Sequence, residues 1–211
     1  RDDTYRLIWS RHHLLLDGWS TPILLKEVFA LYEGHVQGKE VKLDKPRPYG
    51  EYIAWLQKQD LEKAKAFWKK ELDGFHAPTP LTVDHPPTPG VLDRVFDERT
   101  LDLPEATASA LQAFCRKHQL TMSTILQAAW ALVLSRYSGE ADVIFGATAS
   151  GRSADVPGIE RMVGLFINTL TVRIKVEPEQ TVVEWLSGLH RHLAELREYE
   201  HSPLVQVHEW S

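Results

Sequence analysis

The stretch SRHHLLLDGWS, Ser10 to Ser20, contains the residue types that acid–base chemistry and metal binding require. Two adjacent histidines, His12 and His13, lie a few residues before Asp17 and Gly18. Histidine titrates near neutral pH and is both a proton acceptor and a common metal ligand. The stretch therefore indicates a metal site, a histidine base with its support, or an apolar strand that ends in polar residues.

The expected local structure disfavours the metal site. Tyr5, Leu7 and Trp9 alternate with more polar neighbours, which predicts a strand that runs into the histidines. Successive side chains of a strand point to opposite faces, so His12 and His13 would not reach the same ion. We therefore predict no metal at this stretch.

A core histidine beside a buried loop is the plainer alternative to a catalytic one. Three leucines precede Asp17, however, which predicts that the chain enters the core and that Asp17 is buried. A buried carboxylate needs a partner. Gly18 then permits a turn or a close approach of the backbone. Nucleophilic catalysis has little support, because no G-x-S-x-G elbow is present and Cys115, the single cysteine, lies in an apolar helical stretch. General acid–base work by one histidine, with acyl transfer as a natural use, is the chemistry that remains.

Helical and strand patterns are interleaved along the chain, which predicts an α/β or α+β fold. Ser20 is expected to cap a helix that ends near Gly34 or Gly38. Further helices are expected over 50–74, in one broken piece or two short ones with Asp60 as an internal cap, and over 121–139. Another helix is expected to open at Pro104, and a stripe of leucines from Leu186 to Leu196 predicts a last helix that runs to about Tyr199. Strands are expected over 91–103, 141–151 and 170–176.

Five prolines between His76 and Gly90 exclude a helix or a central strand, so this stretch is the best candidate for a boundary. The net charge of −5 and the scattered basic residues argue against a nucleic-acid partner. No apolar run is long enough to predict a membrane span, and cysteine usage favours a reducing compartment. We therefore expect a cytoplasmic protein, and the missing initiator methionine suggests a piece of a longer one.

Four blocks resemble condensation domains of nonribosomal peptide synthetases, which belong with chloramphenicol acetyltransferase to the HHxxxDG acyltransferases. The opening block HHLLLDGWS resembles their HHxxxDG signature. The later blocks are PYGEYIAWLQKQD, ASGRSADVPGIERMVGLFINTLTVRI and YEHSPLVQVHEWS, in the family's order. The resemblance covers the whole chain but only about half of such a domain, so the chain is expected to be inactive alone.

The resemblance implies an α/β fold of the chloramphenicol acetyltransferase type, a two-layer sandwich built as two lobes. Residues 1–75 would end the first lobe and carry the motif, 76–92 would form the proline-rich crossover, and 93–211 would begin a truncated second lobe. Each of these boundaries is an expectation from the resemblance and from the proline-rich stretch.

The resemblance also implies peptide-bond formation between two thioesters held on phosphopantetheine arms of carrier domains. The partners would be the upstream and downstream peptidyl carrier domains and an adjacent adenylation domain, with no cofactor bound directly. His13, the second motif histidine, is expected to be catalytic. His12, Asp17 and Gly18 are expected to support the site, and Asp17 to pair with an arginine upstream of residue 1.

Three further residues are expected to line the substrate tunnel: Trp19, Ser20 and Asn168. Arg152 matches the family's S-G-R loop and is expected to be a solvated loop arginine. The sequence around Asn168 favours the subtype that joins two L-residues. The alternatives are a non-catalytic recruitment platform, an epimerisation domain, and an acyltransferase that uses acyl-CoA.

Overall fold

The computed structural model describes residues 4–81 and 97–211. The first part of the chain forms three helices, α1 (Ser20–Gln37), α2 (Gly50–Leu56) and α3 (Leu61–Glu71). Helix α1 ends at Gly38, which has a left-handed φ of 64°, as expected for a glycine at a helix end. The expected internal cap is confirmed, because the Asp60 carboxylate accepts the amide of Lys63 at 3.0 Å.

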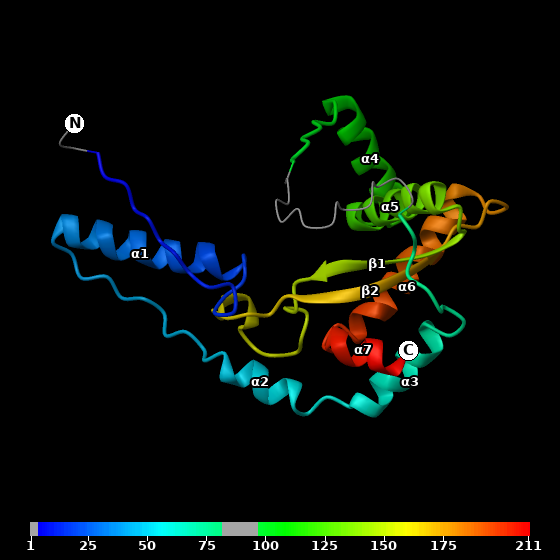
Figure 1. Cartoon of the computed structure of the whole chain (residues 1–211). Coiled ribbons are helices and arrows are strands. Elements are labelled where there is room, and N and C mark those ends of the chain that lie inside the picture. Colours follow the sequence, from blue (N-terminus) through cyan, green and yellow to red (C-terminus); the bar gives the residue numbers. More distant parts are fainter. Residues whose placement is uncertain (1–3, 82–96) are drawn as a thin grey trace, which may run out of the picture. The chain divides into compact units, whose positions relative to one another are not determined.

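The second part contains both helices and strands, and from residue 104 onward the predicted elements occur in the predicted order (Figure 1). Its elements are α4 (Glu105–His118), α5 (Met122–Ser138), β1 (Asp142–Ala149), the 3₁₀ helix η1 (Ile159–Arg161), β2 (Asn168–Lys175), α6 (Val182–Glu198) and α7 (Leu204–Trp210). The first turns of α5 and α6 are capped by Thr121 and Thr181, whose hydroxyls accept backbone amides. The short helix α7 was not predicted.

Among the described residues, β1 and β2 form one two-stranded sheet, and the two strands run side by side in Figure 1. The predicted strand that leads into the histidines is wrong, because residues 4–12 lie in no helix or strand. A strand exists only through ladder hydrogen bonds to a neighbouring strand, and among the described residues the sheet contains β1 and β2 alone. Residues 97–103 of the predicted strand 91–103 also form no strand, and 91–96 lie outside the described residues.

The described chain divides into two compact units. The first contains Arg1–Ala66, Thr148–Thr169 and Glu200–Glu209, and the second contains Phe67–Ala147, Leu170–Tyr199 and Trp210–Ser211. The predicted lobe boundaries at 75 and 93 stay a prediction, because most of 76–92 lies outside the described residues. None of the described helices is long and apolar enough to span a bilayer.

The second unit has its core between α5 and α6, which lie next to each other in Figure 1. The predicted stripe on α6 is confirmed, because its leucines are buried: Leu186, Leu189, Leu193 and Leu196. A polar contact crosses the same interface, where the Thr124 hydroxyl lies 2.9 Å from His190 Nδ1. On β2, Arg173 forms a two-point ion pair with Asp142, with its closest contact at 2.7 Å.

Candidate active site

The two histidines of the motif lie at an exposed turn of the first unit. The turn is closed by the amide of Leu15, which donates to the carbonyl of His12 at 3.1 Å. The amide of Leu14 donates to His12 Nδ1 at 3.1 Å, which leaves Nε2 as the ring nitrogen of His12 without a hydrogen-bond partner among the described residues. The His13 ring is exposed and makes no hydrogen bond to any residue that the structure describes.

Because the predicted strand is absent, strand geometry does not separate His12 from His13. Their hydrogen bonds distinguish them instead. His12 accepts the amides of Leu14 and Leu15, whereas the His13 ring makes no hydrogen bond within the described residues. Within the described ranges, no group of three or more His, Cys, Asp or Glu side chains is placed to hold a metal ion.

Asp17 lies at the other end of the motif and is completely buried. Its Oδ1 accepts the amide of Ser20 at 2.9 Å and lies 2.8 Å from the Ser20 hydroxyl, while Oδ2 accepts the amide of Phe166 at 3.1 Å. The Asp17 amide itself donates to the carbonyl of Gly164 at 3.1 Å. The carboxylate thus joins the start of α1 to the segment 164–166.

The cation that neutralises Asp17 is Arg152. Its Nη2 lies 3.2 Å from Asp17 Oδ1, and the two side chains are 4% and 0% exposed. Nη1 donates to the carbonyls of Ile159 at 2.6 Å and Met162 at 2.9 Å, and the guanidinium stacks over the Phe166 ring at 3.9 Å. Two expectations are therefore wrong: Arg152 is not solvated, and the partner of Asp17 does not lie upstream of residue 1.

The charge state of Asp17 follows from these contacts. Burial alone would raise the pKa of the Asp17 carboxyl. The hydrogen bonds from Ser20 and from the Phe166 amide, together with the charge of Arg152, outweigh burial and lower the pKa below its ordinary value. Asp17 is therefore a fixed anion at neutral pH, which suits a brace and not a proton donor.

Ser20 contributes to this brace and does not cap its helix in the expected way. It is the first residue of α1 and is completely buried. Its hydroxyl contacts Asp17, accepts the Gly164 amide at 3.1 Å and lies 3.0 Å from the Gly164 carbonyl. The prediction that Ser20 serves as the helix cap is wrong, because the Asp17 carboxylate accepts the amide of Ser20, the first free backbone donor of α1.

Two glycines let the backbone approach closely enough for Arg152 to reach Asp17. Gly151 has a left-handed φ of 66°, and a Cβ there would lie 1.9 Å from the Phe166 carbonyl oxygen. A Cβ at Gly164 would lie 2.2 Å from the ring of Tyr49. Side chains at either position would separate the S-G-R loop, the segment 164–166 and α2.

Tyr49 and Tyr52, from the PYGEYIAW block, pack against Phe166 next to the site. No role was predicted for either residue. Tyr49 donates its hydroxyl to the Leu165 carbonyl, and its ring meets Phe166 edge-on at 5.0 Å. Tyr52 belongs to a buried cluster with Val156, Ile159, Met162 and Phe166. Burial raises the pKa of Tyr49 above its ordinary value and that of Tyr52 to about 12, so both phenols stay neutral.

Trp19 and Gly18 are exposed beside the brace, and the Arg152 guanidinium lies 5.6 Å from the centre of the Trp19 ring. Trp19 is half exposed, and its indole Nε1 donates to the Glu160 carbonyl at 3.0 Å, which fixes the ring. A Cβ at Gly18 would meet no described atom within 4 Å, so packing against the described residues does not require a glycine there. Both residues border an open hollow and stay candidates for contact with a substrate.

Asn168 is half-buried at the start of β2. Its amide nitrogen donates to the carbonyls of Glu200 at 2.8 Å and Ser202 at 2.7 Å, which ties β2 to the turn before α7. The adjacent Glu200 carboxylate accepts the Ser153 hydroxyl, next to Arg152. The predicted role of Asn168 in lining a tunnel stays a prediction.

Comparison with known proteins gives this arrangement a family. A family model described as "Condensation domain" matches residues 1–210. The chain belongs to the condensation-domain family. Among curated proteins, a linear gramicidin synthase of Brevibacillus parabrevis is 48% identical over 210 residues, which is 100% of this chain and 3% of that protein. Chondramide synthase of Chondromyces crocatus is 46% identical over 210 residues, 100% of this chain and 5% of that protein.

Solved structures show that the chain has the fold of condensation domains. The first condensation domain of the CDA synthetase matches with a TM-score of 0.72 and 18% identity over 91% of this chain and 42% of that one. The SgcC5 protein of Streptomyces globisporus matches with a TM-score of 0.75 and 23% identity over 94% of this chain and 45% of that one. The predicted α/β fold of this family is therefore confirmed, and the chain spans less than half of these structures and under a tenth of the curated relatives.

Proposed function

We propose that the protein containing this condensation segment forms a peptide bond between two carrier-bound substrates in nonribosomal peptide synthesis. The donor would be an acyl or peptidyl thioester, and the acceptor the α-amine of an aminoacyl thioester, each on a phosphopantetheine arm. The observation that carries the proposal is an exposed His13, placed four residues from a buried Asp17–Arg152 brace in a chain of this family.

The proposed step needs neither a metal nor a covalent acyl-enzyme. The amine nitrogen attacks the thioester carbonyl, the new C–N bond forms, the C–S bond breaks and the donor arm leaves as a thiol. An α-amine has a pKa of about 7.7 to 8.0 and histidine one of about 6.5, so roughly a tenth of the amine is already nucleophilic at neutral pH. His13 would orient the amine and accept its proton as the tetrahedral adduct forms, which typically contributes about 10²- to 10⁴-fold.

The other motif residues would act through position. The Asp17–Arg152 pair holds the loop that carries His13, and His12 supports the turn through its contact with Leu14. Gly18, Trp19 and Asn168 would border the substrates. The sequence around Asn168 further supports the subtype that joins two L-residues.

The full-length protein with both carrier domains loaded tests the proposal. We expect mass spectrometry to find a new amide on the acceptor arm, and an L-configured donor to react faster than its D-isomer. Amide formation that requires acyl-CoA and a soluble acceptor would indicate the alternative acyltransferase. Inversion of the donor without amide formation would indicate an epimerisation domain, and the absence of both reactions would indicate a recruitment platform.

A further inference from the structure

The end of α3 is held to the rest of the second unit by two side chains, one from β2 and one from α6. Arg173 of β2 donates from Nη1 to the carbonyls of Glu71 and Asp73, each at 2.8 Å. Backbone carbonyls at the end of a helix have no partner within the helix, so Arg173 supplies donors that α3 itself lacks. His192 of α6 lies with its Nε2 3.1 Å from the Glu71 carboxylate. Both contacts join distant parts of the sequence within the second unit.

The contact made by Arg173 does not change with pH near neutrality. Its guanidinium also pairs with Asp142 of β1, and the hydrogen bonds to Asp142 outweigh burial and raise the pKa of Arg173 above its ordinary value. Helix α6 is fixed as well, because the Trp185 indole donates to the Lys175 carbonyl at 2.8 Å and the leucine stripe of α6 is buried. The His192 contact differs, since a histidine titrates near neutral pH.

The surroundings of His192 favour its protonated form. The hydrogen bond with Glu71 raises the pKa of His192 above its ordinary value, although burial acts in the opposite direction. The charges of Glu71 and Glu195 and a hydrogen bond with the backbone of Arg173 raise this pKa further. A protonated ring has a donor on each nitrogen and can serve both partners together, whereas a neutral ring has only one donor. Loss of the proton therefore weakens the contact with Glu71 in two ways.

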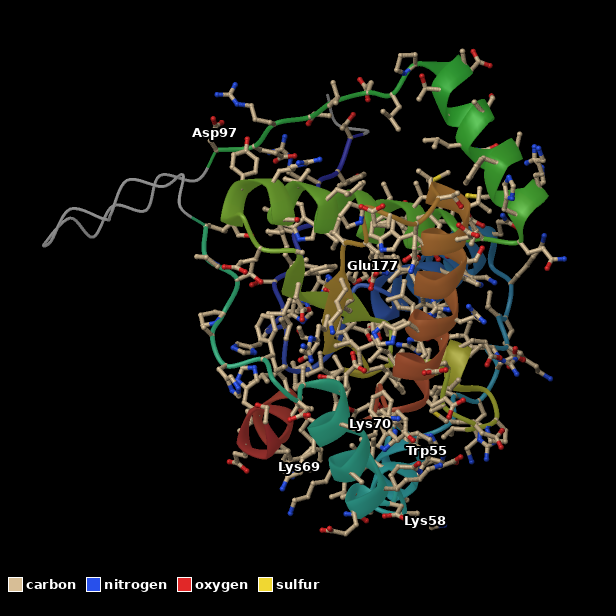
Figure 2. The ribbon with its side chains drawn as sticks, turned by 90° about the vertical axis from the view of Figure 1, so that its right-hand side faces the viewer. Trp55, Lys58, Lys69, Lys70, Asp97 and Glu177 are labelled. Carbon is tan, nitrogen blue, oxygen red and sulfur yellow. The ribbon has the colours of Figure 1, made fainter. Side chains whose placement is uncertain are left out.

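Further charged groups face His192 from α3, from β2 and from the turns that follow them. Two cavities of about 390 and 190 Å³ share His192 in their lining, and the His192 side chain is 27% exposed, so protons can exchange with the solvent. Lys70 lies on the last turn of α3 (Figure 2). Besides the groups already described, the two cavities are lined by two lysines and two carboxylates: Lys70, Lys175, Asp73 and Glu177. Their charges offset one another, which leaves Glu71 and Glu195 to favour the charged ring.

We propose that His192 and Glu71 form a proton-dependent clasp that closes on the end of α3 in acid and opens as the pH rises. Because the pKa of His192 is raised in the folded protein, the stabilisation is complete below the ordinary histidine pKa of about 6.5. It is lost as the pH rises through the raised value. With the clasp open, Arg173 still binds the carbonyls at the end of α3, so this end loosens without leaving its place. The clasp is independent of the proposed function.

Hydrogen exchange of the full-length protein between about pH 6 and about pH 9 tests the clasp. After correction for the intrinsic pH dependence, exchange in peptides that span 67–75 should rise about fivefold across this range, as expected for the loss of one partly exposed ion pair. His192→Gln and Glu71→Gln each remove one charge of the pair but keep a polar side chain. Both variants should exchange as fast at about pH 6 as the wild-type protein does at about pH 9, with a flat response. The double variant should exchange no faster than either single one.

His118→Gln is the matched control, because it removes another histidine of the second unit. His118 ends α4 and forms no ion pair with a carboxylate in the described parts of the chain, so this variant should keep the wild-type pH response. Peptides that span 189–196 should change little, since buried leucines hold α6. An equal rise there would show that the whole unit loosens and would contradict the clasp. A wild-type protein without the pH response would overturn it, and so would a full response in His192→Gln.

Discussion

His13 and Asp17, near the two ends of the HHxxxDG motif, are only four residues apart but differ completely in their surroundings. His13 is exposed and unbonded within the described residues, whereas Asp17 is buried and accepts hydrogen bonds from Ser20, Arg152 and Phe166. The difference indicates a division of labour, in which one end fixes the loop and the other is left free to meet a substrate. A group that must accept and release a proton needs such freedom, while its support does not.

Removal of the cation should disturb the buried end most strongly. Arg152→Ala leaves the Asp17 carboxylate buried without its counter-charge, which typically costs about 3 to 5 kcal/mol. We therefore expect hydrogen exchange in peptides that span 14–22 and 162–168 of the full-length protein to accelerate at least about a hundredfold.

Arg161→Ala is the control for this prediction, because the Arg161 side chain is 70% exposed and pairs with an exposed Asp44. Its effect on exchange should stay within about 1 kcal/mol. Equal exchange in Arg152→Ala and in the wild-type protein would show that the ion pair does not hold the loop.

A methyl group at Gly164 should destabilise the loop less than the loss of Arg152 does, although Gly164 also contacts Asp17 through its carbonyl. The new Cβ of Gly164→Ala would overlap the Tyr49 ring, and overpacking of this kind costs about 1 to 3 kcal/mol. Gly188→Ala provides the contrast, because Gly188 lies inside α6 with open space around it. That change should stabilise α6 by up to about 1 kcal/mol. Exchange measured in both segments decides whether the two glycines differ as predicted.

The hydroxyl of Tyr49 should contribute a smaller amount. Tyr49→Phe keeps the ring against Phe166 but leaves the Leu165 carbonyl without its donor, a loss of about 1 kcal/mol. Exchange of the 162–168 peptide should rise about fivefold, with little change in the peptide that carries the histidines. A larger change at the histidines than at 162–168 would place Tyr49 in a different role.

Acid should weaken the ion pair between Asp17 and Arg152, because Asp17 becomes protonated at low pH but not at neutral pH. The pKa of Asp17 is lowered in the folded protein, so its contribution is complete above the ordinary carboxyl pKa of about 4. That contribution is lost as the pH falls through the lowered value, because the protonated carboxyl no longer pairs with Arg152. Exchange at 14–22, corrected for its intrinsic pH dependence, should therefore increase below about pH 4. Asp17→Asn should flatten this increase, and an unchanged acid response would assign it to another group.

Local sequence patterns were sufficient to predict most helices and strands of the second unit, although not at 97–103, where the expected strand is absent. The leucine stripe of α6 predicts a helix and the apolar alternation of β2 predicts a strand. Both elements lie where they were expected. The segment before the histidines shows the same alternation, yet it forms no strand among the described residues. A strand needs a partner that its own sequence does not contain, whereas a helix bonds within itself.

The brace could be predicted only in part for a similar reason. A buried Asp17 requires a cation, and the sequence therefore predicted that a partner exists. Arg152 lies 135 positions away, and only the fold brings it to the carboxylate. Gly151 beside it, with its left-handed φ, was the available local signal that the S-G-R loop makes a close approach.

The division of labour within the motif is tested most directly by the single-turnover rate of amide formation in the full-length protein with His13→Ala. Exchange at 14–22 serves as the check that Asp17 and Arg152 stay in place. We predict a rate about 10²- to 10⁴-fold below wild type with exchange unchanged. Amide formation at the wild-type rate would contradict the account, because the exposed histidine would then have no part in the reaction.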